Sequence, residues 1–216
     1  MLRTEQTNTM CAGMNKHTKK RGRCEMEASA ISPPTAAPAA SPVKPAKRVA
    51  HQSPYEYLQH LANGNKFPTT DDITFHSYSE EEAESYTMDV ATAVRNLNIE
   101  KMKALQSQGQ LFQCSNRFGE SLIHIACRRG SLEVAKLLVE EAKVSIKCVD
   151  DFGRTPLHDA CWTAEPNFEL MNFLVSLCPA LLFVTDKRGH TPLHYTRREH
   201  HHLWNSFLEE NKETIL

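Results

Sequence analysis

Residues 118–130 read FGESLIHIACRRG, residues 152–164 read FGRTPLHDACWTA, and residues 188–200 read RGHTPLHYTRREH. The three segments align without gaps, and their histidines, at positions 124, 158 and 194, are separated by 34 and 36 residues. A period of this length is typical of a chain in which one small structural unit stacks on the next. The repeat decides the fold class, and the rest of the sequence is interpreted around it.

Each unit predicts a pair of short helices. Thr155 and Thr191 are placed to cap a helix, and the proline after each fits the first turn, where no backbone N–H is needed. Residues 131–142 carry apolar side chains at helical spacing and predict a second helix. Gly153 and Gly189 each follow an Asp by three residues and suit a tight turn with positive φ. One pair buries too little apolar surface, so neighbouring units must stack.

The segment Thr155-Pro156-Leu157-His158-Asp159-Ala160 resembles the T-P-L-H-x-A motif of the ankyrin repeat. The resemblance covers about residues 88–216 and implies an all-α solenoid of about four stacked helix-turn-helix units with short hairpin loops. It further implies that the three repeated histidines are structural and bond the backbone between adjacent hairpins. We expect an N-terminal capping unit at 88–116, repeats at 117–150 and 151–186, and a C-terminal capping unit at 187–216 ending in a helix such as Leu203–Glu210.

The chain departs from the ankyrin pattern in several places. Residues 121–124 read SLIH without Thr-Pro, and residues 162–167 add length between the two helices of one repeat. Residues 181–184 are unusually apolar for a connecting loop and are expected to pack beneath the hairpins. Thr196 and Arg197 occupy two positions where the family has alanine.

The N-terminal quarter has a different composition. Residues 1–53 hold nine Lys/Arg against three Glu, a net charge of +6, which leaves −7 on residues 54–216. The Ala/Pro/Ser-rich stretch at 29–54 predicts a disordered tail over 1–53. Basic clusters at 19–23 and 44–48 fit a nuclear import signal or a polyanion-binding arm, although a solvated charge run is the favoured interpretation, and an organelle transit role stays open. Ser32, Ser41 and Ser53 precede prolines and are candidate phosphorylation sites.

A transition segment at 54–87 joins the tail to the repeats. Ser53 and Glu56 have the spacing of a capping box and predict a short helix that ends near Gly64. Ser79 followed by three glutamates predicts a second capped helix. Both are expected to be packing or capping elements without a site.

Composition excludes several classes of protein. The chain has 216 residues, of which 40 % are hydrophobic, and no apolar run approaches the roughly 18–20 residues of a membrane span. The N-terminus reads MLRTEQTNTM, without the apolar core of a secretory signal. Seven cysteines without a C-x-x-C pair disfavour a disulfide framework or a zinc ribbon. We therefore expect an intracellular protein, cytoplasmic or nuclear.

No residue pattern indicates catalysis. Cys127 and Cys161 share one column of the repeat, and Cys114 and Cys148 share another, as expected for buried thiols in place of alanine, with no partner base indicated. The run at 200–202 is histidine, but consecutive side chains fan around a helix by about 100° each and do not converge on a metal. We expect no catalytic residue, no metal and no cofactor, and therefore no enzyme.

The resemblance places a partner-binding surface on the hairpin tips and the exposed ends of the first helices. By register, the tips are Arg117, Phe118, Glu120, Asp151, Phe152, Arg154, Lys187, Arg188 and His190, and the helix ends are Arg128, Arg129, Trp162, Thr163 and Arg198. Aromatic residues and arginines dominate interface energetics, and an exposed apolar patch indicates a partner; packing of the aromatic residues against neighbouring hairpins is the alternative.

The expected function is a non-enzymatic adaptor, scaffold or regulatory subunit that binds a protein through the concave face of the stack. The alternative is a nuclear regulatory protein whose basic tail contacts nucleic acid or acidic partners. Nucleic acid is expected only as a ligand of the tail, and neither a membrane nor a small molecule is expected as a partner.

Overall fold

The computed structural model describes residues 52–62 and 73–216 of the chain. Within these ranges the structure is helical, without a β-strand, and its one isolated bridge joins Ser115 and Ser121. Residues 1–51 of the predicted disordered tail lie outside the described residues, and with them the basic clusters, Ser32 and Ser41; Gly64 also lies outside. No helix in the described ranges is long and apolar enough to cross a membrane.

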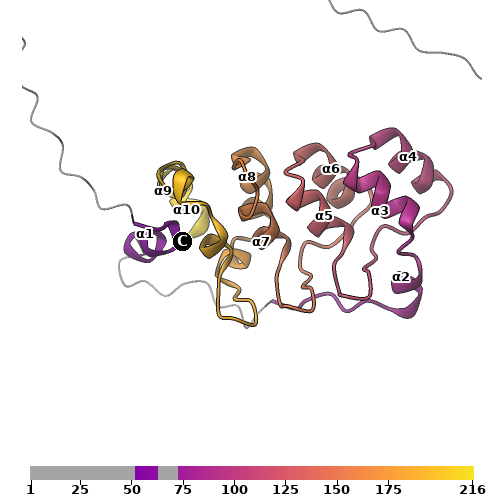
Figure 1. The fold of residues 1–216 in the computed structure, drawn as a ribbon, viewed down its shortest axis with the longest axis horizontal. Helices are drawn as coiled ribbons and strands as arrows, with labels where there is room; N and C mark the ends of the chain where they lie inside the picture. The colour runs from indigo at the N-terminus through magenta and orange to yellow at the C-terminus, as the bar shows by residue number, and fades with distance from the viewer. Residues whose placement is uncertain (1–51, 63–72) are drawn as a thin grey trace, which may run out of the picture. The chain divides into compact units, whose positions relative to one another are not determined.

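Helix pairs stack side by side, and the loops that join successive pairs extend to one side of the stack (Figure 1). The first pair is α3 (Met88–Arg95) and α4 (Ile99–Ser107), and the second is α5 (Leu122–Arg128) and α6 (Leu132–Lys136), which continues as the π-helical turn η1 (Leu137–Glu141). The third is α7 (Pro156–Cys161) and α8 (Phe168–Leu177). The predicted all-α repeat solenoid is confirmed.

A single apolar core runs through the stack because each helix buries one face against the next unit. The first helices α5 and α7 are buried along nearly their whole length, whereas α8 alternates buried and exposed positions as an outer helix does. The apolar stretch at 181–184 lies within and just after the 3₁₀ helix η2 (Pro179–Phe183) and buries Leu181 and Leu182, as the sequence predicts.

The last unit differs from the expected helix pair. Thr191 caps its first segment as predicted, but that segment is the 3₁₀ turn η3 (Pro192–Tyr195), and the backbone becomes extended at Thr196 and Arg197. The buried Thr196 hydroxyl donates to the Leu193 carbonyl and so closes the turn instead of extending it. Residues 194, 198 and 202 therefore do not share the face of one helix. The chain continues through η4 (Arg198–His200), α9 (His201–Glu210) and α10 (Lys212–Ile215).

The N-terminal helix α1 (Pro54–Leu61) packs against α9 of the last unit (Figure 1). The Tyr57 hydroxyl donates to Glu209 at 3.1 Å, and the Asn205 side-chain amide donates to the Gln52 carbonyl at 3.2 Å. The capping box that the sequence predicts at Ser53 is present. One end of the stack is thus closed by a helix that precedes the repeats in the sequence.

The second capped helix, α2 (Glu80–Glu84), lies at the opposite end of the stack near α3 (Figure 1). Ser79 forms the predicted capping box with Glu82. The strand-like segment before α2 crosses the stack, where the His76 N–H donates to the Lys147 carbonyl at 2.7 Å and Tyr78 packs against the core. The role of residues 54–87 as packing elements fits these contacts.

Candidate partner-binding site

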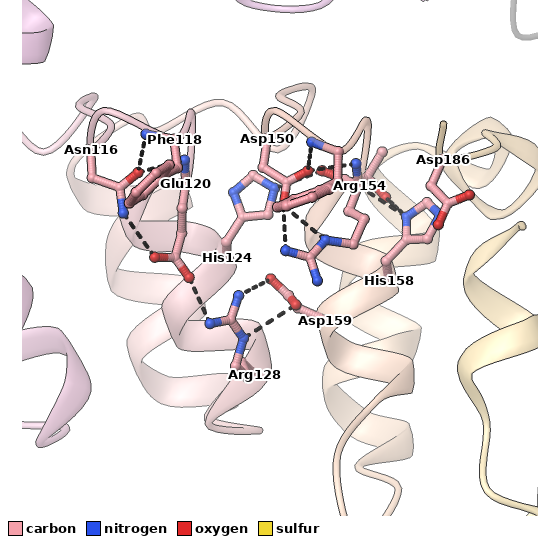
Figure 2. A network of polar contacts seen from close by, with 12 residues as sticks. Asn116, Phe118, Glu120, His124, Arg128, Asp150, Arg154, His158, Asp159 and Asp186 are labelled. Atoms are coloured by element: carbon pink, nitrogen blue, oxygen red, sulfur yellow. Dashed lines mark hydrogen bonds and ion pairs between the residues drawn. The ribbon is translucent and has the colours of Figure 1, made fainter. Parts of the chain in front are cut away.

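Each hairpin between helix pairs is closed by one polar side chain. The Asp150 Oδ1 atom accepts hydrogen bonds from the N–H groups of Phe152 and Arg154, at 2.9 and 2.8 Å. Asn116 and Asp186 accept the equivalent bonds in their own hairpins (Figure 2). Gly153 completes its turn with φ of 78°, as the Asp-x-x-Gly spacing predicts.

Successive hairpins are joined through the backbone of two phenylalanines. The Phe118 carbonyl accepts from the Asp151 N–H, and the Phe152 carbonyl accepts from the Lys187 N–H, both at 2.9 Å. The side chains of the same two phenylalanines remain 51 % and 54 % exposed. Backbone bonding therefore fixes the position of each ring without covering it.

Two of the three repeated histidines, His124 and His158, bond the backbone of the next hairpin, whereas His194 accepts from Thr191 in its own turn. In His158 the Nδ1 atom accepts from the Thr155 N–H at 3.0 Å, so Nε2 carries the proton and donates to the His190 carbonyl at 3.1 Å. His124 repeats this arrangement and donates to the Arg154 carbonyl at 3.0 Å (Figure 2). Burial lowers the pKa of His158 to about 4, so its ring is neutral at pH 7. The structural role implied by the ankyrin resemblance is confirmed for these two residues.

Two adjacent hairpins and helices α5 and α7 enclose a pocket of about 590 Å³, called here the aromatic pocket. Its walls are the rings of Phe118, Phe152 and Trp162, which are all about half exposed. Its charged lining residues are Glu120, Arg128, Asp150, Arg154 and Asp159. Six of these eight residues are in the predicted surface, and the structure brings them together.

The sequence analysis missed Asp150 and Asp159. Asp150 was available from its Asp-x-x-Gly spacing, which indicates the residue that closes a turn. Asp159 occupies the variable position of the T-P-L-H-x-A motif, and its partner Arg128 lies 31 residues away. Only the stacking of α5 on α7 shows that the two meet.

Both arginines in the aromatic pocket are paired with its carboxylates. Arg128 donates from Nε and Nη2 to the two carboxylate oxygens of Asp159, at 3.2 and 3.0 Å, and its Nη1 lies 2.7 Å from Glu120. Arg154 binds the Asp150 carboxylate at 2.8 and 2.6 Å (Figure 2). Burial raises the pKa of Asp159, and the Arg128 guanidinium opposes that shift.

Trp162, the third aromatic residue of the pocket wall, packs against a residue of the last unit. Trp162 stacks on Tyr195, with ring centroids 5.5 Å apart and an interplanar angle of 29°, yet 52 % of Trp162 stays exposed. Arginines also lie over the other two rings, with Arg154 5.0 Å from Phe152 and Arg117 4.6 Å from Phe118. Each of the three rings thus packs against a neighbouring side chain and still leaves about half of its residue exposed to solvent.

The other predicted surface residues lie outside the aromatic pocket. Arg117 lines a neighbouring pocket of about 610 Å³ that shares Phe118 and Glu120 and adds Tyr86 and Met88, which the sequence analysis also missed. The remaining tip residues, Asp151, Lys187, Arg188 and His190, are exposed. Arg129 and Thr163 lie in a separate pocket, and Arg198 lines a third pocket beside Ser53. The predicted surface is therefore not one cavity.

Four cysteines are buried, as their repeat columns predict: Cys114, Cys127, Cys148 and Cys161. Burial raises the pKa of Cys127 and Cys161, and that of Cys114 to about 11. The expectation that no base lies near a cysteine is wrong for Cys148, whose sulfur is 3.9 Å from the His124 Nδ1 atom. Cys148 has no exposed surface, so no substrate can reach that sulfur. In the part of the chain that the structure describes, no three His, Cys, Asp or Glu side chains are grouped to hold a metal.

Comparison with known proteins agrees with this architecture. A family model of ankyrin repeats, in three copies, matches residues 90–178. The human SMC5-SMC6 complex localization factor protein 1 is 34 % identical over 83 residues, which cover 38 % of this chain and 8 % of that protein, and its Bos taurus counterpart is 32 % identical over the same length. The E3 ubiquitin-protein ligase KEG of Arabidopsis thaliana is 36 % identical over 56 residues, or 26 % of this chain and 3 % of the ligase.

These relatives are much longer proteins, and the matched segments span less than a tenth of their length. The similarity therefore concerns the repeats and not the whole relatives. Ankyrin repeats are typically non-catalytic protein-interaction modules. On its repeat motif, its stacked helix pairs and the matched family model, the chain contains ankyrin repeats over residues 90–178.

Proposed function

We propose that residues 88–216 form a non-enzymatic interaction domain that binds a protein partner at the aromatic pocket and the hairpin tips around it. The observation that carries this proposal is the row of Phe118, Phe152 and Trp162, each fixed in place and each about half exposed. Removing such apolar surface from water favours binding, and rigid aromatic anchors lose little conformational entropy on binding. An adaptor, scaffold or regulatory subunit would act in this way.

The names of the relatives support a role in which binding positions another protein. One is called a complex localization factor and another is a ubiquitin ligase, and both functions require partner recognition. We propose the same kind of role for this chain, with the basic residues 1–53 controlling where the domain acts.

A photo-crosslinking experiment tests the proposed surface. The full chain is prepared with p-benzoylphenylalanine in place of Phe152, or in place of Leu177 as the matched control. Leu177 is 45 % exposed, ends the outer helix α8 and does not line the aromatic pocket. We expect a crosslinked protein from cell extract with the probe at 152, lost when Phe118→Ala and Trp162→Ala are added, and absent with the probe at 177.

Equal crosslinking from positions 152 and 177 would show that the partner contacts another surface. Circular dichroism and urea unfolding of each variant provide the folding control. Because the three rings are half exposed and their backbone bonds do not depend on the side chains, we expect the alanine variants to remain folded.

A further inference from the structure

Free positive charge gathers on the same side of the domain as the aromatic pocket, although residues 54–216 carry a net charge of −7. Arg117 and Arg95 line the pocket that adjoins Phe118, and the Arg129 Nε atom donates to the Arg95 carbonyl at 2.9 Å. Lys187 and Arg188 form the tip of the next hairpin along. None of these five cations makes an ion pair within residues 52–62 and 73–216.

Exposed negative charge is sparse at the hairpin tips themselves and common elsewhere, including Glu80 and Glu81 of α2 beside the adjoining pocket. Glu84 in the adjoining pocket and Asp151 at a hairpin tip are exposed acids without an ion pair among the described residues. The outer helices and their ends carry most of the other exposed acids: Glu133, Glu140, Glu141, Glu169, Glu210 and Glu213. The exposed ends of the hairpins, beside the aromatic rings, therefore carry more positive than negative charge.

The interior of the aromatic pocket favours a different kind of partner side chain from the charged rim around it. Arg128 and Arg154 are already bound to Asp159, Glu120 and Asp150. A charged side chain that entered the pocket would have to replace one of these pairs, whereas an apolar side chain would contact the three rings without disturbing them. The occupant of the pocket is thus an uncharged apolar or aromatic side chain.

We propose that the partner supplies an acidic segment with an apolar anchor: an aromatic or large aliphatic side chain between Phe118, Phe152 and Trp162, flanked by carboxylates that face Arg117 on one side and Lys187 and Arg188 on the other. This inference rests on the proposed protein-binding function and states which protein segments fit it. Charge complementarity of this kind sets both the encounter rate and the choice of partner.

Single-stranded nucleic acid also combines negative charge with groups that stack on aromatic rings. The acidic segment is favoured because three carboxylates line the aromatic pocket, and a phosphate chain following the rings would pass directly over them. A labelled twelve-residue oligothymidine is therefore included as a probe.

Peptide selection on the full chain tests the proposal. A phage-displayed library of random 12-residue peptides is selected on the wild-type protein, with counter-selection on the Phe118→Ala/Phe152→Ala/Trp162→Ala variant. The enriched peptides are synthesised with a fluorescent label, and their Kd is measured by anisotropy. We expect net negative peptides with a central apolar residue.

A charge-reversal variant supplies the decisive comparison. Arg117→Glu/Lys187→Glu/Arg188→Glu is expected to weaken binding of these peptides about tenfold at low salt, and less at high salt. The matched control, Glu133→Lys/Glu140→Lys/Glu141→Lys on the outer helix region, is expected to leave Kd unchanged. Unfolding curves equal to that of the wild type show that both variants remain folded.

The outcomes separate this inference from the proposed function. Enriched peptides that are neutral or basic but still require the three rings would overturn the acidic chemistry and leave the interaction surface standing. A selection that yields no ring-dependent peptide would overturn both. Tighter binding of oligothymidine than of every selected peptide would assign the surface to nucleic acid and overturn the acidic-segment inference.

Discussion

Arg128 and Asp159 lie in adjacent repeats, and two N–H groups of the guanidinium donate to the two carboxylate oxygens at 3.2 and 3.0 Å. The carboxylate is almost fully buried, with 3 % of its side chain exposed, while the guanidinium is 45 % exposed. The pair therefore joins two repeats and also forms part of the pocket that we propose as the binding site.

Removing the arginine leaves a buried charge without a partner. We expect Arg128→Ala to lower the free energy of unfolding by about 3 kcal/mol, at the lower end of the range for buried pairs because the arginine is partly solvated. Urea unfolding measures this. The double variant Arg128→Ala/Asp159→Asn is expected to be more stable than Arg128→Ala alone, and a double variant that loses the full sum of both single losses would contradict the coupling.

The loss of unfolding free energy caused by Arg128→Ala should be smaller at lower pH. Burial already raises the pKa of Asp159 in the native protein, and loss of the guanidinium raises it further. The native variant then binds a proton at a pH where the unfolded chain does not, so its stability falls as pH rises through that window. Unfolding curves at pH 5 and pH 8 test the sign, and a larger deficit at pH 5 would contradict it.

His158 predicts a pH dependence of the opposite sign. Its native pKa of about 4 lies below the ordinary value of 6.5, so between these two pH values the unfolded chain binds more protons. Stability is expected to fall by about 3 kcal/mol as pH decreases from 7 to 4, since one pKa unit corresponds to about 1.4 kcal/mol. His158→Ala should reduce this slope in urea unfolding measured between pH 4 and pH 7, and an unchanged slope would contradict the role of His158.

Alanine substitutions at two glycines with similar backbone angles distinguish the cost of backbone strain from the cost of a steric contact. Gly119 has φ of 73° and Gly189 has φ of 81°, but a Cβ added at Gly119 would meet the Asp150 Cα at 3.1 Å, whereas one at Gly189 would meet nothing within 4 Å. We expect Gly189→Ala to cost about 1 kcal/mol and Gly119→Ala at least about 1 kcal/mol more. Urea unfolding measures both losses of unfolding free energy. Equal losses would show that the neighbouring hairpin moves away from the added Cβ at no cost, and would contradict the expected steric effect.

The docking of α1 on α9 predicts a local effect. Leu58 is 2 % exposed, and we expect Leu58→Ala to speed amide hydrogen exchange in α1 and α9 while α5 keeps its protection. Gln59→Ala, at an exposed position of the same helix, is the matched control. Unchanged exchange in α9 would show that α1 does not stabilise the last unit.

Short-range sequence patterns determined the helices, their caps and the hairpins. Ser53 and Ser79 form capping boxes with a glutamate three residues later, and Asp150 closes its turn three residues before Gly153, because all these bonds join residues close in sequence. The first helix expected in the last unit was predicted wrongly. The T-P-L-H motif is present there, but the turn ends at the buried Thr196.

Only the tertiary structure determined which side chains contact one another across the boundaries between units. Arg128 meets Asp159 and Trp162 stacks on Tyr195 across a repeat boundary, and no local pattern encodes such contacts. The same holds for α1, whose amphipathic pattern shows that it must pack but not that its partner is α9, at the far end of the sequence. Period and spacing fix which atoms lie close along the chain, whereas contacts between side chains depend on how each unit turns relative to the next.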